Sequence, residues 1–335
     1  MAFKAVKPAE DFAETVADPG NEQLRLERPD RYDLTAALMI VRAMETSSGR
    51  AAVYEEIKNK NAIYRLVDRL YILAGTRVLQ PLILFAYMLK CVVSLGSFKD
   101  VGSEAVTVSS FPNEHKTIDR VAELVPDLRL HRITAARGHI LKPGNLFAVL
   151  HMVKAFPRLW SFLRVLVRRH SFMPSARIAS ALAFYMRFSH LFAERPALKA
   201  AIVASNYSPE AVGMAAAAHR HGRQVVYSNH APVPANGQVV PPVLADCALF
   251  YGDETTQTYK RRARISAEVG LIGQPGTARA MEWRDVVNTV GIFLTSGTKA
   301  DVLQSLIATI RVDLPQVRII VRQHPVLLLK TDFSS

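Results

Sequence analysis

The fold class follows from the stretch Val317-Arg318-Ile319-Ile320-Val321-Arg322-Gln323-His324-Pro325, an apolar strand that stops at a polar Gln-His-Pro corner. Another apolar strand is predicted over Thr289–Leu294, and a helix over Lys299–Val312 lies between the two. A strand, a helix and a strand in this order form a βαβ unit, whose strands are parallel. We therefore predict an α/β fold.

Polar loops follow both strands of this unit. In an open α/β sheet, ligands bind outside the carboxyl ends of the strands, so the two loops should share one rim. The predicted ligand residues are Ser296, Gly297, Thr298, His324 and Pro325. A capped helix start suits a phosphate, which indicates a nucleotide diphosphate. The alternative is structural: Ser296 and Thr298 only cap the helix, and His324 only bonds to its own loop.

The helix after the first loop is expected to bury one apolar stripe against the sheet. The stripe consists of Val302, Leu303, Leu306, Ile307 and Ile310.

The same layout occurs earlier in the chain. A strand over Ala201–Ala204 leads through the loop Asn206–Glu210 into a helix, and the next strand, Gln224–Ser228, runs into Asn229-His230-Ala231-Pro232. Further strands are expected over Cys247–Tyr251 and Val269–Gly273. Strands that alternate with helices predict a doubly wound, Rossmann-type sheet.

These segments together resemble a known family. The stretch Asn206–Pro232, the run Ala245–Glu254, the corner Gly273-Gln274-Pro275 and the run Arg322–Pro325 are similar in order and spacing to bacterial surface-polysaccharide glycosyltransferases. These are the capsule, polysialyltransferase-like and glycerophosphotransferase-like enzymes of the GT-B architecture, which has two Rossmann-type domains. The resemblance covers roughly Lys199 to Pro325. The run Asn229-His230-Ala231 replaces the Gln-His-Gly of the family.

The resemblance implies roles for individual residues. His324 and Pro325 would border the phosphate and ribose of a nucleotide-activated sugar, and His230 would face them across the cleft. A histidine there acts either as a general base toward an acceptor hydroxyl or as a cation beside the leaving phosphate. Asp253 and Glu254 are alternative bases that rank behind His230, because acidic residues often only cap a helix start.

Arg322 precedes the second corner. Its guanidinium suits phosphate oxygens, so it is a candidate for pairing with the diphosphate, although a structural role fits equally well. The scheme requires no metal and no resident cofactor, and the Asp-x-Asp triplet of metal-dependent transferases is absent from the sequence. The two cysteines, Cys91 and Cys247, fit neither a zinc pattern nor a disulfide framework.

The chain is strongly basic, with a formal net charge of +13 over 335 residues, which indicates an acidic partner. No acidic residue occurs between Asp127 and Glu194. Within this segment Asn145–Arg169 is predicted to be a helix, bent near Pro157, with one apolar side. That side comprises Leu146, Val149, Leu150, Val153, Phe156, Leu159, Trp160, Leu163 and Leu166.

A basic amphipathic helix of this kind suits the surface of an anionic membrane. The alternative is a core helix with a solvated basic face. Nucleic acid is a weaker candidate partner, because the arginines alternate with aliphatic residues and no nucleic-acid motif occurs. We therefore expect a cytoplasmic protein that contacts the inner face of the cytoplasmic membrane.

Four regions are expected along the chain. Residues 1–32 form a flexible tail, and 33–100 form a helical extension whose apolar window Arg77–Leu95 is buried or interfacial. Residues 101–280 form a Rossmann-like domain with a helical insertion at about 140–195. Its first βα loop, with Ser109, Ser110, Asn113 and His115, would face the acceptor. Residues 285–335 begin a second, nucleotide-binding Rossmann-like domain, which is incomplete unless a partner chain completes it.

Three functions remain open. The first is a glycosyltransferase that moves a sugar from a nucleotide-activated donor to a polysaccharide or lipid-linked acceptor. The second is an inactive relative that scaffolds polysaccharide assembly. The third is a basic lipid- or nucleic-acid-binding protein without catalytic activity.

Overall fold

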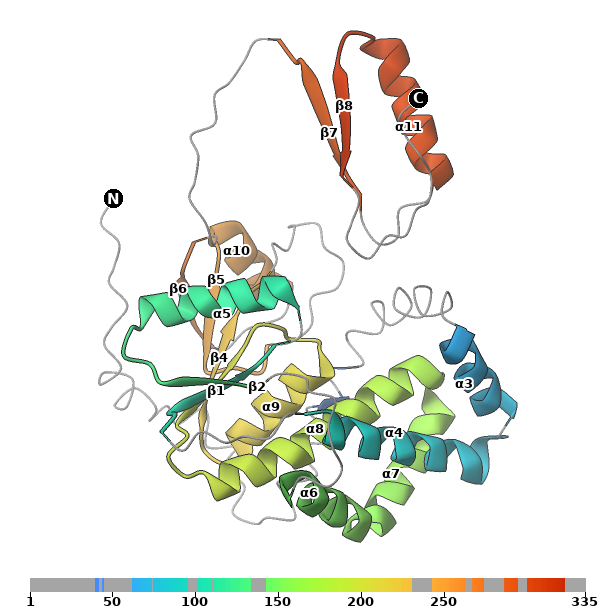
Figure 1. Cartoon of the computed structure of the whole chain (residues 1–335), viewed down its shortest axis with the longest axis vertical. Helices are drawn as coiled ribbons and strands as arrows, with labels where there is room; N and C mark the ends of the chain where they lie inside the picture. Colours follow the sequence, from blue (N-terminus) through green and yellow to red (C-terminus); the bar gives the residue numbers. More distant parts are fainter. Residues whose placement is uncertain are drawn as a thin grey trace.

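A parallel sheet of six strands organises the middle of the chain. The computed structural model describes residues 40–41, 44, 62–73, 75–95, 102–109, 111–133, 143–230, 243–262, 267–273, 286–294 and 300–322. The strand order is β2-β1-β3-β4-β5-β6, and every pairing is parallel (Figure 1). The strands are β1 Ala105–Val108, β2 Leu130–Ile133, β3 Ala200–Val203, β4 Gln224–Ser228, β5 Cys247–Phe250 and β6 Glu268–Leu271. The predicted α/β class with a parallel sheet is confirmed, and this sheet is compatible with a Rossmann-like fold.

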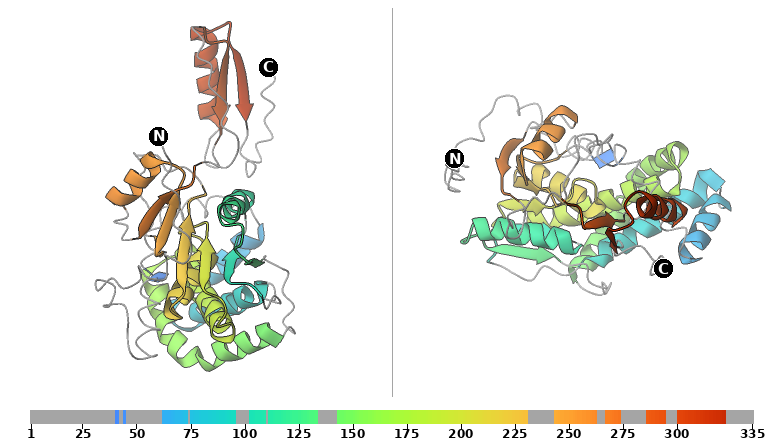
Figure 2. Two further views of the ribbon diagram at one scale, coloured as in Figure 1. Left: turned by 90° about the vertical axis from the view of Figure 1, so that its left-hand side faces the viewer. Right: turned by 90° about the horizontal axis from the view of Figure 1, so that it is seen from above.

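Helices cover both faces of this sheet because successive strand residues point to opposite sides. Ala105 of β1 and Ile202 of β3 pack with Ile118 of helix α5, Pro112–Leu124. Their neighbours Val106 and Val203 belong to the larger core, which also contains residues of α8, Phe172–Glu194, and α9, Pro209–Arg220. Figure 2 gives the same arrangement from two other directions.

Three helices, α6, α7 and α8, lie between β2 and β3 in sequence. The predicted helix over Asn145–Arg169 is two helices, α6 Pro143–Lys154 and α7 Phe156–Arg169, with an angle of 74° between them. The bend was predicted. The residues of the predicted apolar side have two environments, because Leu159, Leu163 and Leu166 are buried, whereas Leu146, Leu150 and Val153 are exposed. The bend separates the outer face of α6 from the stripe that α7 buries.

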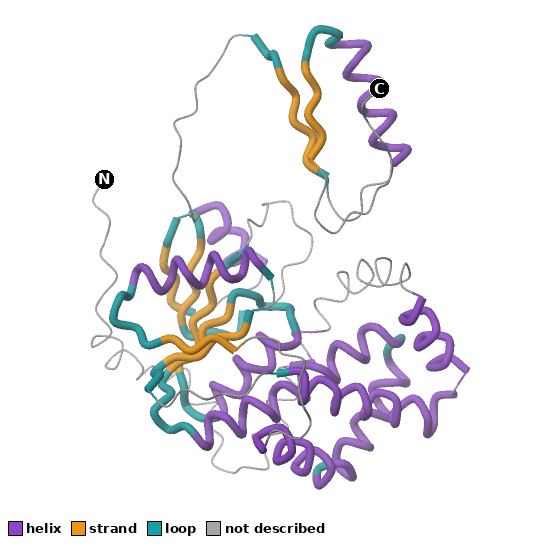
Figure 3. Tube along the Cα trace, in the orientation of Figure 1, coloured by secondary structure: helices purple, strands orange, loops and turns teal. Residues whose placement is uncertain are grey.

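The N-terminal helices gather beside this group (Figure 3). They are α3 Ala62–Leu73, the π-helical turn η2 Gly75–Leu79 and α4 Gln80–Ser94. Leu84, Met88 and Val92 of α4 are fully buried in the main core, within the window predicted to be buried or interfacial. Residues 1–32, predicted as a tail, lie outside the described residues.

Among the described residues, no single helix is both long and apolar enough to cross a membrane. The bent pair Leu146–Lys154 and Phe156–Arg169 meets the length and composition requirements only when the two helices are taken together.

A second, two-stranded sheet occurs near the end of the chain. It consists of β7 Thr289–Phe293 and β8 Arg318–Arg322, paired in parallel and connected through α11, Ala300–Asp313. The βαβ unit is confirmed, but the predicted apolar stripe is buried only at Leu303, while Val302 and Leu306 are exposed. Two strands offer little area, so α11 has a narrow surface on which to bury side chains.

Two histidines of the helical region should make the protein sensitive to acid. Burial is the main cause that lowers the pKa of both His190 and His221. The unfolded chain then binds more protons than the folded one below an ordinary histidine pKa of about 6.5, so this stability is present above that pH and lost as pH falls through the folded pKa.

We expect the urea midpoint to decrease between about pH 7 and about pH 5, and the double substitution His190→Gln and His221→Gln to flatten this dependence. If the urea midpoint changed with pH equally in wild type and in the double variant, His190 and His221 would not be the cause of the acid sensitivity.

Candidate functional site

The carboxyl edge of the six-stranded sheet has a reversal of strand order. From β1 the chain goes to β2 on one side and then to β3 on the other. In open α/β sheets a crevice for ligands forms at such a switch point. Because Val108 pairs with Val203, the next residues, Ser109 and Ala204, follow neighbouring strands that are about 4.8 Å apart. Each of these two residues bonds to a histidine.

His230 is held at this edge by the backbone of Ala204, the residue that follows β3. Its Nδ1 hydrogen-bonds to the carbonyl oxygen of Ala204, and its Nε2 lies 3.3 Å from the Tyr207 hydroxyl. A carbonyl only accepts, so Nδ1 must donate. The neutral ring therefore carries its lone pair on Nε2, on the side of Tyr207. This arrangement sets the tautomer that a general base requires.

The loop that carries Tyr207 is fixed from within and from outside. Ser205 Oγ accepts hydrogen bonds from the backbone N–H groups of Tyr207 and Ser208 at 3.4 and 3.1 Å. Ser208 Oγ caps α9 by accepting from Ala211 N–H at 3.4 Å. Arg177 of α8 donates to the Tyr207 carbonyl at 2.5 Å. The position of Tyr207 is thus determined by both ends of its loop and by α8.

The second histidine lies at the start of α5. Ser109 Oγ is 2.8 Å from His115 Nδ1, and Ser109 is buried. Of the other residues predicted for this loop, Asn113 is exposed and Ser110 lies outside the described residues. His115 and His230 are consequently anchored to adjacent strand ends, on the two sides of the switch point.

Helix α5 is also joined to the end of β5. Thr117 Oγ1 lies 2.6 Å from the Tyr251 hydroxyl, and Thr117 is fully buried. Burial raises the pKa of Tyr251, while the bond to Thr117 acts in the opposite direction. This contact ties the His115 side of the edge to the strand that precedes the two candidate carboxylates.

A buried polar network supports the end of β4. The Tyr227 and Tyr259 hydroxyls are 3.0 Å apart, and Asn229 Nδ2 donates to them at 3.2 and 3.3 Å. Burial is the first cause that raises the pKa of Tyr227 well above its ordinary value, so its hydroxyl stays protonated. Since Asn229 directly precedes His230, the network restrains the backbone from which the imidazole extends.

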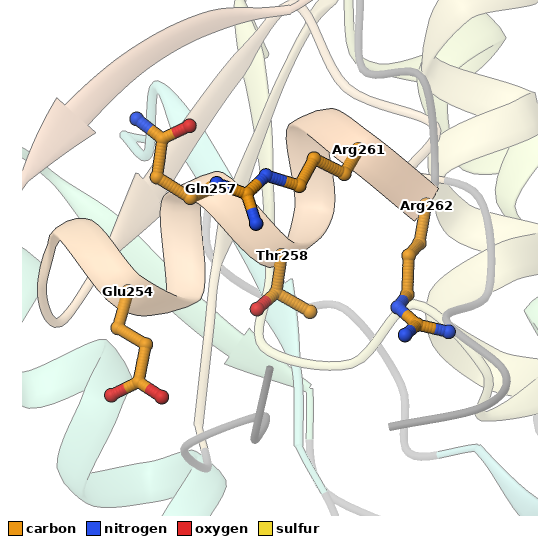
Figure 4. A pocket seen from close by; sticks show the side chains of 5 residues that line it. All are labelled: Glu254, Gln257, Thr258, Arg261 and Arg262. Carbon is orange, nitrogen blue, oxygen red and sulfur yellow. The ribbon is translucent and has the colours of Figure 1, made fainter. Parts of the chain in front are cut away.

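The two predicted carboxylates open helix α10, Asp253–Arg262, and both are exposed. Glu254 lines a pocket of about 480 Å³ together with Gln257, Thr258, Arg261 and Arg262, all on the same helix (Figure 4). The structure pairs His230 with Ala204 and Tyr207, whereas Asp253 and Glu254 lie exposed at the start of α10.

Of the residues predicted to bind the nucleotide-activated donor, the structure describes only Arg322. Ser296, Gly297, Thr298, His324 and Pro325 all lie outside the described residues. Arg322 is the last residue of β8, where it pairs in register with Phe293 and is exposed. The described residues also hold no group of three or more His, Cys, Asp or Glu side chains that could bind a metal ion.

The sequence did not single out Tyr207, Ser109's bond to His115, or the Ala204 carbonyl as parts of one site. Tyr207 and Ala204 lie 23 and 26 positions from His230. A partial signal existed, because parallel strands bring the residues after each strand to the same edge. Which of those residues touch depends on the register of β3 and β4.

The fold and the site together show a parallel α/β protein. Two histidines, His115 and His230, lie at the carboxyl edge of its sheet. No family model, curated protein or solved structure matches the chain.

Proposed function

We propose that the chain is a glycosyltransferase of the GT-B type that moves a sugar from a nucleotide-activated donor to an acceptor hydroxyl. The six-stranded sheet would supply the acceptor side, and the unit β7–α11–β8 would belong to the donor side. The observation that carries this proposal is the orientation of His230. Its Nδ1 donates to Ala204, which leaves Nε2 as the basic nitrogen at the switch point.

In this mechanism His230 Nε2 takes the proton of the acceptor hydroxyl while the acceptor oxygen bonds to the anomeric carbon. The bond between that carbon and the donor's phosphate oxygen breaks, and its electron pair leaves with the nucleotide. Tyr207, at 3.3 Å from Nε2, orients the imidazole and marks the position where an acceptor hydroxyl would approach. His115 would contact the acceptor from the β1 side.

The experiment tests a panel of nucleotide-activated sugars as donors. The full-length protein is incubated with UDP-, CDP- and CMP-activated sugars and with lipid-linked or oligosaccharide acceptors, and nucleotide release and product mass are measured. We expect turnover with one nucleotide class. The substitution His230→Ala should lower turnover by about 10²- to 10⁴-fold, because it removes a general base.

His219→Ala is the matched control. His219 lies in the last turn of α9 and pairs with Asp246 at 3.2 Å, before β5 begins, so it belongs to the opposite edge of the sheet. Its loss should leave turnover within about twofold of wild type. Folded protein that binds a nucleotide but turns over no donor would contradict the enzyme and favour a scaffold. Full turnover by His230→Ala would remove His230 from the mechanism.

A further inference from the structure

The outer face of α6 is apolar. Leu146, Phe147, Leu150 and Val153 are 45%, 43%, 50% and 50% exposed. Their spacing of three and four residues places them on one side of the helix. The other side, with Ala148 and Met152, is buried. Phe147 borders this face, because its ring also stacks on His190 of α8 at 4.2 Å between ring centroids. The stripe of Leu146, Leu150 and Val153 along one exposed helix face exceeds the scattered exposure that is common on protein surfaces.

The outer face of α7 is basic. Arg158, Arg164 and Arg168 are exposed, and their positions fall on the half of the helix opposite to the buried Leu159 and Leu163. Arg169 extends the same exposed face at the end of the helix. An arginine face of this kind attracts phosphate groups through charge and through paired hydrogen bonds.

The two helices that carry these faces adjoin. Helix α7 begins at Phe156, two residues after α6 ends, and the axes meet at 74°. Both helices contact the same two helices, α4 and α8, while α9 packs between α8 and the strands β1, β3 and β4. Figure 1 shows α6 and α7 along the lower border of the helical group. The apolar and basic faces therefore belong to the outside of one layer of helices.

We propose that the outer faces of α6 and α7 form a docking surface for an anionic lipid bilayer. Charge complementarity favours lipid, because no acidic residue occurs between Asp127 and Glu194 to oppose the arginines. The apolar stripe beside them distinguishes lipid from nucleic acid, since it provides surface for acyl chains and none for phosphates. The proposal does not depend on the transferase activity.

The binding test uses the full-length protein and two vesicle types, phosphatidylcholine alone and phosphatidylcholine with phosphatidylglycerol. Co-sedimentation should show binding to the anionic vesicles and weakening as salt is raised. The triple substitution Arg158→Gln, Arg164→Gln and Arg168→Gln should weaken binding by about 100-fold, at about fivefold per arginine. The pair Leu146→Glu and Leu150→Glu should weaken it by at least about tenfold.

The matched control is Arg261→Gln with Arg262→Gln, two exposed arginines of α10. This pair should bind vesicles like wild type, and circular dichroism of every variant should match wild type. Because the substituted side chains are exposed, the variants should fold.

Three results would overturn the proposal. The first is no preference of wild type for the anionic vesicles. The second is an equal loss of binding in the α10 control. The third is vesicle binding that survives the leucine pair while a single-stranded RNA competes fully, which would identify a nucleic-acid surface instead.

Discussion

Replacing Gly213 with valine is expected to abolish the cooperative folded state of the six-stranded domain. Gly213 lies on α9 where that helix meets α8. A Cβ at this position would be 2.6 Å from the Ala181 carbonyl oxygen, 2.8 Å from Phe184 Cβ and 2.8 Å from Tyr185 N. Two of these atoms are backbone atoms of a buried helix, so they cannot rotate out of the way.

The two helices would have to separate, which would open the main core between them. We expect a loss on the order of 4 kcal/mol or more in the free energy of unfolding, a large share of the about 5–15 kcal/mol that a native domain has. Circular dichroism and urea unfolding would measure it. Gly252→Ala is the control, because a Cβ there meets no atom within 4 Å. A Gly213→Val protein with the wild-type midpoint would show that α8 and α9 do not approach this closely.

Replacing Phe188 with alanine is expected to cause the second large loss in the free energy of unfolding. Phe188 lies in the middle of α8, is 1% exposed and belongs to the main core. Removing its ring takes away buried apolar area and leaves a cavity, which costs about 3–5 kcal/mol when the surrounding residues cannot close it. We expect a correspondingly lower urea midpoint with an unchanged slope.

Phe293→Ala tests whether this cost comes from burial. Phe293 is the same residue type but 72% exposed on β7, so its removal should change the free energy of unfolding by less than about 0.5 kcal/mol. If both variants lost stability equally, the loss could not be assigned to the core around α8.

Prediction from the sequence succeeded where one residue pattern had one structural solution. The apolar runs at 224–228 and 289–294 contain the strands β4 and β7, because short segments with β-branched residues and with turn residues on both sides favour a strand. It missed β2, and it gave the helical insertion at about 140–195 without the separate bounds of α8. Helix α8 is buried on nearly all sides, so it has no polar face to reveal its period, and β2 contains His131 and Arg132 at a sheet edge, so it lacks an apolar run.

The candidate site could also be predicted from the sequence only in part. The sequence indicated that His230 follows a strand and would lie at the carboxyl edge of the sheet, and the structure places it at that edge. It could not indicate that Ala204 receives the Nδ1 proton or that Tyr207 faces Nε2. The register between β3 and β4 and the Arg177 bond to the Tyr207 carbonyl decide those contacts.

By itself, then, the sequence determined the parallel α/β class, the edge on which the histidine lies and the acid-free basic segment, because these depend on local periodicity and composition. The tertiary structure alone decided which strand ends are neighbours, which tautomer His230 adopts and which face of α6 stays exposed. Those features depend on contacts between residues that are distant along the chain, and no local pattern encodes such contacts.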